Sequence, residues 1–237
     1  MSFLFTKNKL TRALHVLQPS CCSFCHCRQV NPICHSCLKR LKADSHFHQC
    51  LICGKPNLSW VCKSCGTADW AFDQTVVLAN ETSRLVPTVH AFHQYGQITE
   101  LAVILYAWKM IKLSRVAPVD LIIPFPENLN ISQSRGFWSA LELAKTWGKL
   151  IHSPYNQELI TVMSNPLTQR MSPVIHPFQI NTELISTFSI TDFRIAIILP
   201  YMQSPHQLHE VAKILKKHGA RSVINWVLIR NSSKENR

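Results

Sequence analysis

The chain has 237 residues, of which 46% are hydrophobic and only 16% are charged, and its formal net charge is +12. This composition excludes an intrinsically disordered chain, and the length allows one medium-sized domain plus a smaller module. No apolar run approaches the roughly 20 residues of a membrane span, and no secretory signal is recognisable. We therefore expect a cytoplasmic protein. The basic charge makes nucleic acid the first class of partner to consider, with equal weight for a surface charge that only aids solubility.

Residues 1–19 are predicted to form a short amphipathic helix, because Leu10, Leu14 and Leu17 recur at helical spacing. The segment contains three basic residues and no acidic residue. We expect this helix to pack on the module that follows it. Association with the surface of an anionic membrane is the alternative.

Four CxxC pairs occupy residues 20–70, and the last two pairs repeat the first two with an offset of 28 residues. Two residues between cysteines let one tight turn point both sulfurs at one ion, and two such turns complete a tetrahedral four-thiolate zinc site. The repeat therefore predicts a double zinc ribbon with two structural zinc ions. The predicted ligands are Cys22, Cys25, Cys34 and Cys37 in the first ribbon, and Cys50, Cys53, Cys62 and Cys65 in the second.

The sequence leaves the combination of the CxxC turns open. Pairing within each ribbon is preferred, and a crossed pairing is the alternative. A disulfide framework is disfavoured, because the chain lacks a secretory signal and is long enough to build a core without such bridges. Cys21 and Cys27 fall outside the repeat and are expected to be spare thiols. Two zinc tetrathiolates would lower the formal charge from +12 to about +8.

Residues 71–237 alternate between strand-like and helix-like segments, which predicts an α/β domain with a parallel sheet covered by helices on both faces. A polar loop is expected over residues 127–134 and another over 200–205, and most of 152–190 reads as loop. His206 and His209 are expected on the solvated face of a helix. The expected strands are 75–78, 119–123, 159–162, 195–199 and 223–229, and the expected helices are 98–111, about 140–151 and 207–218.

Three further motifs follow the cysteines: VDLIIPFP at residues 119–126, RGF at 135–137 and KKHGARSV at 216–223. In this order the motifs resemble the ComF family of competence proteins, which join an N-terminal zinc ribbon to a phosphoribosyltransferase-type domain. The resemblance extends over about residues 17–230. It implies a phosphoribosyltransferase-like parallel sheet flanked by helices, with a small N-terminal zinc-ribbon module.

The resemblance also shows which parts of a phosphoribosyl pyrophosphate site this chain lacks. In active phosphoribosyltransferases, two acidic residues hold the ribose hydroxyls, and a Thr-Thr-Gly turn cradles the 5′-phosphate. The corresponding positions here are Leu199 and Pro200, followed by Gln203, Ser204 and Pro205. Leucine and proline offer no ribose acceptor. Pro205 removes an N–H donor and fixes φ near −65°, so the phosphate-binding turn cannot form in its usual way.

The loop before the RGF motif is basic in the family, but here it contains no lysine or arginine until Arg135. We therefore expect a catalytically degenerate domain that uses neither phosphoribosyl pyrophosphate nor Mg²⁺, with zinc as its cofactor. The candidates for a remaining phosphate or ligand loop are Arg135, Gly136 and Ser204.

The resemblance implies a part in natural transformation, in which the protein handles incoming single-stranded DNA in the cytosol, beside a competence helicase or another DNA-processing protein. The basic C-terminal segment supplies the predicted DNA-binding residues, and one of the six tryptophans could stack on a base. Two alternatives stay open: an active phosphoribosyltransferase with a non-standard site, and a zinc-ribbon adaptor that binds another protein. The predicted DNA-binding residues are Lys213, Lys216, Lys217 and Arg221.

Overall fold

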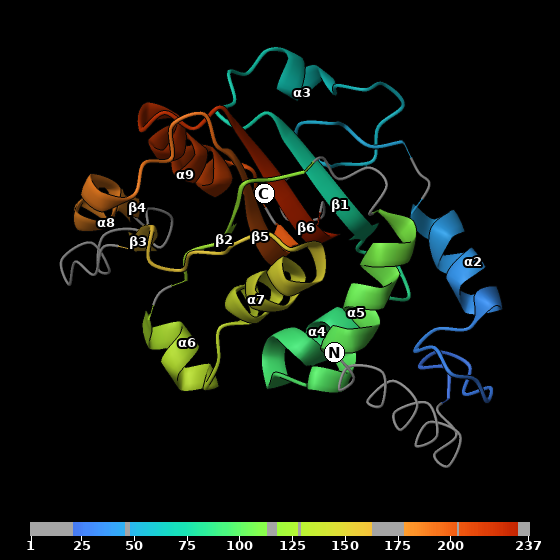
Figure 1. Cartoon of the computed structure of the whole chain (residues 1–237). Helices are drawn as coiled ribbons and strands as arrows, with labels where there is room; N and C mark the ends of the chain where they lie inside the picture. The colour runs from blue at the N-terminus through green and yellow to red at the C-terminus, as the bar shows by residue number, and fades with distance from the viewer. Residues whose placement is uncertain are drawn as a thin grey trace, which may run out of the picture.

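The computed structural model describes residues 21–45, 48–112, 118–127, 129–162, 178–202 and 204–231. Within these ranges the chain forms a four-stranded parallel sheet, a small two-stranded antiparallel sheet and helices that cover both faces of the larger sheet (Figure 1). The helix expected over residues 1–19 lies outside the described residues. No helix in the described part of the chain combines the length and the apolar character that a membrane crossing needs.

The strands of the parallel sheet are ordered β1-β6-β5-β2. Because all of these strands pair in parallel, their carboxyl ends meet at one edge of the sheet, which we call the carboxyl edge. β5 and β6 are almost entirely buried apolar residues, as expected for central strands covered on both faces. The strands are β1 (Gln74–Asn80), β2 (Leu121–Pro124), β5 (Arg194–Met202) and β6 (Ser222–Arg230).

One face of the sheet is covered by α2 (His35–Ser45), α4 (Val86–Tyr95), α5 (Ile98–Ile111) and α7 (Ser139–Ile151). At the centre of this layer, the rings of Trp108, Trp147 and Trp226 have centroids 5.6 to 6.5 Å apart. The other face is covered by α9 (His206–Lys217), α8 (Thr182–Thr187) and the hairpin of β3 (Ile160–Val162) and β4 (Phe178–Ile180).

The predicted fold class, a parallel α/β sheet flanked by helices and joined to a small N-terminal cysteine module, is confirmed. The helix predicted over residues 98–111 matches α5. The helix predicted over residues 207–218 matches α9, which buries four apolar residues on its inward face. Gly219 follows α9 with φ of +94°, a left-handed conformation that glycine commonly supplies just beyond a helix C-terminus. The inward residues are Leu208, Val211, Ala212 and Leu215.

Three predictions of loops are wrong. Most of the segment predicted as a polar loop over 127–134 belongs to helix α6 (Leu129–Arg135), and Glu127, just before the helix, forms an ion pair with Arg135 at its end. β5 continues to Met202, so Pro200 lies within a strand, between Leu199 and Tyr201, which pair with Val227 and Ile229 of β6. The region predicted as mostly loop over 152–190 contains β4 and α8. These elements have only 3 and 6 residues, which is too short for a recognisable apolar periodicity.

Candidate metal centres and the carboxyl edge

The eight cysteines of the CxxC pairs form two separate groups. Within each group, the sulfur atoms of the four cysteines all lie within 4.8 Å of one another. The grouping follows the preferred pairing within each repeat and not the crossed alternative. We call residues 21–37 the first cysteine unit and residues 49–65 the second cysteine unit. Their groups are Cys22, Cys25, Cys34 and Cys37, and Cys50, Cys53, Cys62 and Cys65.

The two units share their backbone hydrogen bonds at the same 28-residue offset that relates their sequences. The N–H of Cys22 donates to the carbonyl of Cys27 at 2.9 Å, and the N–H of Cys50 donates to that of Lys55 at 2.8 Å. The N–H of Cys34 points at the sulfur of Cys22 at 3.4 Å, and its counterpart contact in the second unit is 3.3 Å long. The repeat in the sequence is therefore a repeat in structure.

The donor geometry fits a zinc ion. A tetrahedral site with zinc–sulfur bonds of about 2.3 Å places its sulfurs roughly 3.8 Å apart. The Cys25 and Cys34 sulfurs are 3.6 Å apart, and the Cys53 and Cys62 sulfurs are 3.8 Å apart. Backbone N–H groups directed at the sulfurs would stabilise the thiolates that a metal requires. Either group could thus hold zinc, and the ion's contribution would be structural, because four protein ligands leave no open position.

The thiols of each group differ widely in pKa, so they would not all ionise together without a cation. Burial opposes ionisation of Cys22, but backbone N–H donors outweigh it and lower its pKa to about 6. The same balance lowers the pKa of Cys50 to about 7. Burial and neighbouring thiols raise the pKa of Cys37 to about 12. Burial is also the main effect that raises the pKa of Cys53 to about 11. Four thiolates this close would repel one another, so a bound divalent ion is needed to deprotonate the full set.

The second cysteine unit is attached to the sheet by polar contacts. The hydroxyl of Thr75 in β1 donates to the carbonyl of Ile52, and the N–H of Thr75 donates to the carbonyl of Leu51. From the last residue of β6, the buried Arg230 guanidinium donates to the carbonyl of Cys53 at 2.9 Å and to that of Met202 at 3.1 Å. The second unit therefore lies along the edge strand β1 and reaches the carboxyl edge.

The first cysteine unit has a more open environment. Cys25 is exposed, whereas its counterpart Cys53 is buried. Cys27, the expected spare thiol, lies beside the ligand group. A hydrogen bond with Cys25 is the main reason why the pKa of Cys27 is raised to about 12. The unit contacts the remainder of the fold mainly through apolar residues that continue into α2.

The positions that resemblance assigns to the phosphoribosyl site contain no acidic group. Leu199 is buried within β5, and no aspartate or glutamate occurs between Arg194 and His209. Pro205 is the residue before α9 and provides no side-chain cap to that helix. The hydroxyl of Ser204 accepts a long hydrogen bond of 3.4 Å from the N–H of His206. A phosphate role for Ser204 stays a prediction.

Arg135 forms an ion pair of 3.1 Å with Glu127, and both side chains are largely buried. Burial raises the pKa of Glu127 against the opposing effect of the arginine. Gly136 has φ of +79°, and a side chain added there would meet nothing within 4 Å. A ligand that uses Arg135 would first have to compete with Glu127 for its charge, which weakens Arg135 as an anion-binding residue.

Sequence reasoning missed a polar cluster close to Arg135. The Nδ1 atom of His93 lies 2.7 Å from the hydroxyl of Ser139, and its ring centroid lies 5.3 Å from that of Tyr201. Burial, together with the positive charge of Arg135, lowers the pKa of His93 to about 4, and burial raises that of Tyr201 to about 12. Ser139 is only 1% exposed, so its hydroxyl is out of reach of a substrate, whereas His93 is half-buried. No spacing motif links these three residues in the sequence.

The predicted DNA-binding residues lie on and just after α9. Lys213, Lys217 and Arg221 are exposed. Lys216 is different, because its ammonium group lies 2.9 Å from a carboxylate oxygen of Asp73 and donates to the carbonyl of Arg221 at 2.9 Å. Three of the four cations are thus available to a phosphate backbone, while the fourth ties α9 to the residue preceding β1.

The expectation that His206 and His209 both lie on a solvated face is wrong for His209. His206 is exposed and packs on the ring of Trp70 at a centroid distance of 5.3 Å. The Nδ1 atom of His209 accepts a hydrogen bond of 3.0 Å from the N–H of Ala71. The first turn of α9 therefore holds the segment between the second cysteine unit and β1, a long-range contact that helical periodicity cannot reveal.

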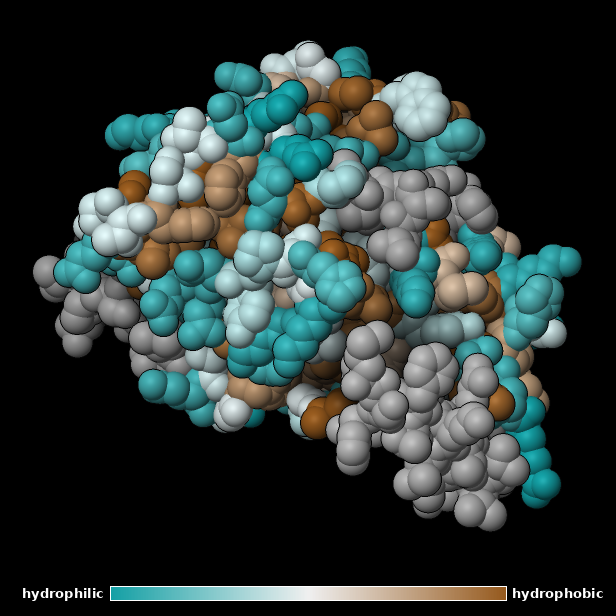
Figure 2. Space-filling model, in the orientation of Figure 1, coloured by the Kyte–Doolittle hydropathy of each residue, from teal (hydrophilic) through white to brown (hydrophobic). Residues whose placement is uncertain are grey.

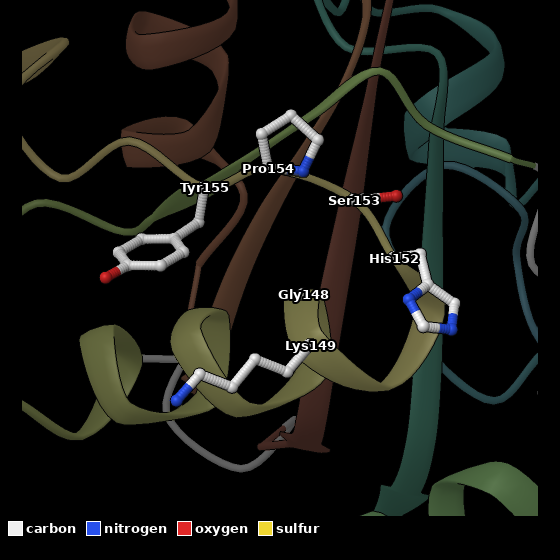
Figure 3. A pocket seen from close by; sticks show the side chains of 6 residues that line it. All are labelled: Gly148, Lys149, His152, Ser153, Pro154 and Tyr155. Atoms are coloured by element: carbon white, nitrogen blue, oxygen red, sulfur yellow. The ribbon is translucent and has the colours of Figure 1, made fainter. Parts of the chain in front are cut away.

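A shallow hollow at the C-terminal end of α7 is a weaker candidate. It is lined by residues of α7 and of the turn that follows, among them Lys149, His152 and Tyr155 (Figure 3). In this view the His152 ring lies apart from the other two polar side chains, so the polar groups do not converge on one point. Gly148 is required here by close packing, because a Cβ atom would lie 2.7 Å from the carbonyl oxygen of Ser153.

The fold and the cysteine groups define an α/β protein with a parallel sheet and two four-cysteine groups that could hold zinc. No protein-family profile matches the sequence, and no curated protein matches it. Among solved structures, the purine phosphoribosyltransferase from Pyrococcus horikoshii Ot3 is similar, with 17% identity, a TM-score of 0.32, and coverage of 67% of this chain and 88% of that chain.

A second similar structure comes from work on an invariant aspartic acid in HPRTs and is a glutamic acid mutant. It shares 15% identity with a TM-score of 0.30, over 52% of this chain and 57% of that chain. At these TM-scores neither similarity bears on the activity of this chain.

Proposed function

We propose that this chain is a ComF-like competence protein that binds single-stranded DNA, or a protein that handles such DNA, in the cytosol during natural transformation. In this proposal, residues 20–70 form a double zinc ribbon with one structural zinc ion in each four-cysteine group. Residues 71–237 form a phosphoribosyltransferase-like domain without phosphoribosyltransferase activity. Zinc is its cofactor, and its function is to bind the DNA or the DNA-handling protein.

The observation that carries the proposal is the contrast between intact cysteine geometry and a carboxyl edge without the acids of a phosphoribosyl site. Both four-cysteine groups have sulfur spacings suited to zinc. By contrast, the end of β5 offers apolar groups where a ribose would need carboxylates. The exposed cations of α9, Lys213 and Lys217, with the nearby Arg221, support contact with a phosphate backbone.

The test is fluorescence anisotropy with a labelled single-stranded oligonucleotide across a salt titration. If the binding uses lysine and arginine contacts to phosphate, the logarithm of the affinity should fall steeply and linearly with the logarithm of the salt concentration. The double variant K213A/K217A should bind more weakly and lower the slope by roughly one to two. An absence of binding at low salt, or an affinity that does not change with salt, contradicts the proposal.

An active phosphoribosyltransferase with a non-standard site is the second candidate. It is favoured by the ionisable cluster of Glu127, Arg135 and His93 near the carboxyl edge, where open α/β sheets bind their ligands. Calorimetry with phosphoribosyl pyrophosphate and Mg²⁺ separates the two candidates. Micromolar binding that is lost in Arg135→Gln would favour the enzyme, and no heat at millimolar ligand would leave it without support. Capture of a protein partner without nucleic acid would instead favour an adaptor.

A further inference from the structure

Trp60 differs from the other tryptophans of the chain. It is 73% exposed, whereas Trp108, Trp147 and Trp226 are almost completely buried and the other two are half-buried. Its backbone is fixed, because the carbonyl of Trp60 accepts a hydrogen bond of 2.7 Å from the N–H of Leu51. The second cysteine unit therefore presents a large aromatic face to solvent from a backbone held between two CxxC turns.

The surroundings of Trp60 combine apolar and basic groups. Leu58 is 95% exposed, and Val61 and Leu51 are exposed as well. Figure 2 shows apolar residues on the surface around α3 (Lys63–Gly66), at this end of the molecule. Residues 48–68 include lysines but no acidic residue. Zinc tetrathiolates carry negative charge, but three of the four sulfur-bearing residues of this unit are buried below the surface.

A hollow of about 320 Å³ lies between Trp60 and the edge strand β1. This volume is at the lower end of the range for small-molecule sites. Its lining includes the apolar Leu51, the amide residues Gln49 and Gln74, and Lys112, which is only 4% exposed. An amide side chain offers both a donor and an acceptor, and lysine offers a positive charge.

These groups match the parts of a nucleotide. A nucleobase has a flat π face that stacks on an aromatic ring and a polar edge that pairs with amide groups. An aliphatic side chain of a protein partner would use the apolar wall but not the amides. The combination therefore favours a nucleotide over an apolar peptide.

We propose that the hollow beside Trp60 binds one unpaired base of single-stranded DNA, which stacks on the Trp60 ring. This inference rests on the proposed function, because it names the surface through which the strand is held. It assigns base contact to the second cysteine unit, while the cations on and after α9 contact phosphate. The stacking is tolerant of sequence, since every base has a π face.

The test measures binding of a fluorescein-labelled 20-nucleotide oligo-dT at low salt by four proteins: wild type, Trp60→Ala, Trp60→Phe and Leu58→Ala. Trp60→Ala should weaken binding by about tenfold or more, the size expected for one stacked base. Trp60→Phe keeps an aromatic face and should bind within about threefold of wild type. Leu58→Ala removes an even more exposed apolar side chain that does not line the hollow, and should leave binding unchanged. Zinc content and the thermal midpoint verify that each variant is folded.

A second measurement is the quenching of intrinsic tryptophan fluorescence by unlabelled oligo-dT. Quenching that is present in wild type and lost in Trp60→Phe supports stacking on this ring. If wild type binds DNA but Trp60→Ala binds equally well, or if quenching persists in Trp60→Phe, the inference is overturned while the proposed function stands. If wild type does not bind the oligonucleotide at all, the proposed function itself fails.

Discussion

The two cysteine units have the same internal hydrogen bonds but different surroundings. In each unit, equivalent N–H groups reach equivalent carbonyls and sulfurs, and the paired distances differ by 0.2 Å at most. The second unit is bound to the sheet by Thr75 and Arg230, whereas the first has an exposed ligand in Cys25. Local sequence therefore determines the ligand geometry, and we expect contacts with the sheet to determine how much of the fold depends on each metal.

The largest expected effect is loss of one ligand from each unit in turn. Cys53→Ser and Cys25→Ser remove equivalent sulfurs, and each variant should hold one zinc ion instead of two. Cys53→Ser should lower the thermal midpoint by on the order of 10 °C, because about 4 kcal/mol of metal-linked stability would be lost from a unit joined to the sheet. Cys25→Ser should lower it by less than about 5 °C. Equal midpoints for the two variants would refute the difference in coupling.

The next effect concerns the arginine that joins the second unit to the sheet. Arg230→Met keeps the apolar length of the side chain but removes the donors to the carbonyls of Cys53 and Met202. The carbonyl of Met202 keeps the N–H of Asn231 as a donor at 3.0 Å, whereas the buried carbonyl of Cys53 loses its donor. A buried acceptor left without a donor costs about 1–3 kcal/mol, so we expect a loss of about that size. Relief from burying a charge opposes this loss. Urea unfolding of Arg230→Met and of Arg230→Lys, which keeps one donor group, measures the effect.

Retention of two zinc ions in Arg230→Met would show that the arginine supports the attachment of the unit and not its metal site. A stability equal to wild type would mean that the hydrogen bonds of Arg230 contribute nothing beyond the cost of burying it. Loss of zinc from the second unit alone would make the arginine part of the metal site's support.

The different attachment of the two cysteine units to the sheet could not be predicted from the sequence. The eight cysteines were predictable as two groups because each pair and its partner pair are close in the chain, and the 28-residue repeat is visible by inspection. The contact of Arg230 with Cys53 spans 177 residues, and no periodicity signals it. The buried strands and α9 were predictable from apolar patterns. Helix α6 was missed, because an ion pair between the ends of a polar segment leaves no such pattern.

The same limit applies to the carboxyl edge. Its missing acids could be recognised, because the resemblance gave the positions at which carboxylates were expected. His93, Ser139 and Tyr201 come from three different elements and meet only through tertiary packing. The attachment of Lys216 to Asp73 likewise removed one predicted DNA contact, since a charge on a helix face does not reveal its partner.

The smallest expected effect is at His26, which forms an equivalent pair of backbone positions with Gly54; both residues have positive φ, 57° and 70°. In Gly54→Ala the new Cβ would lie 2.4 Å from a methyl carbon of Val77, so we expect a loss of about 2–4 kcal/mol from clash and backbone strain together. His26→Gly should instead stabilise by up to about 1 kcal/mol, because glycine adopts this conformation without strain. Chemical denaturation of the zinc-loaded variants measures both signs. A loss in His26→Gly as large as in Gly54→Ala would mean that the first unit is packed as tightly as the second, and the contrast between the two units would fail.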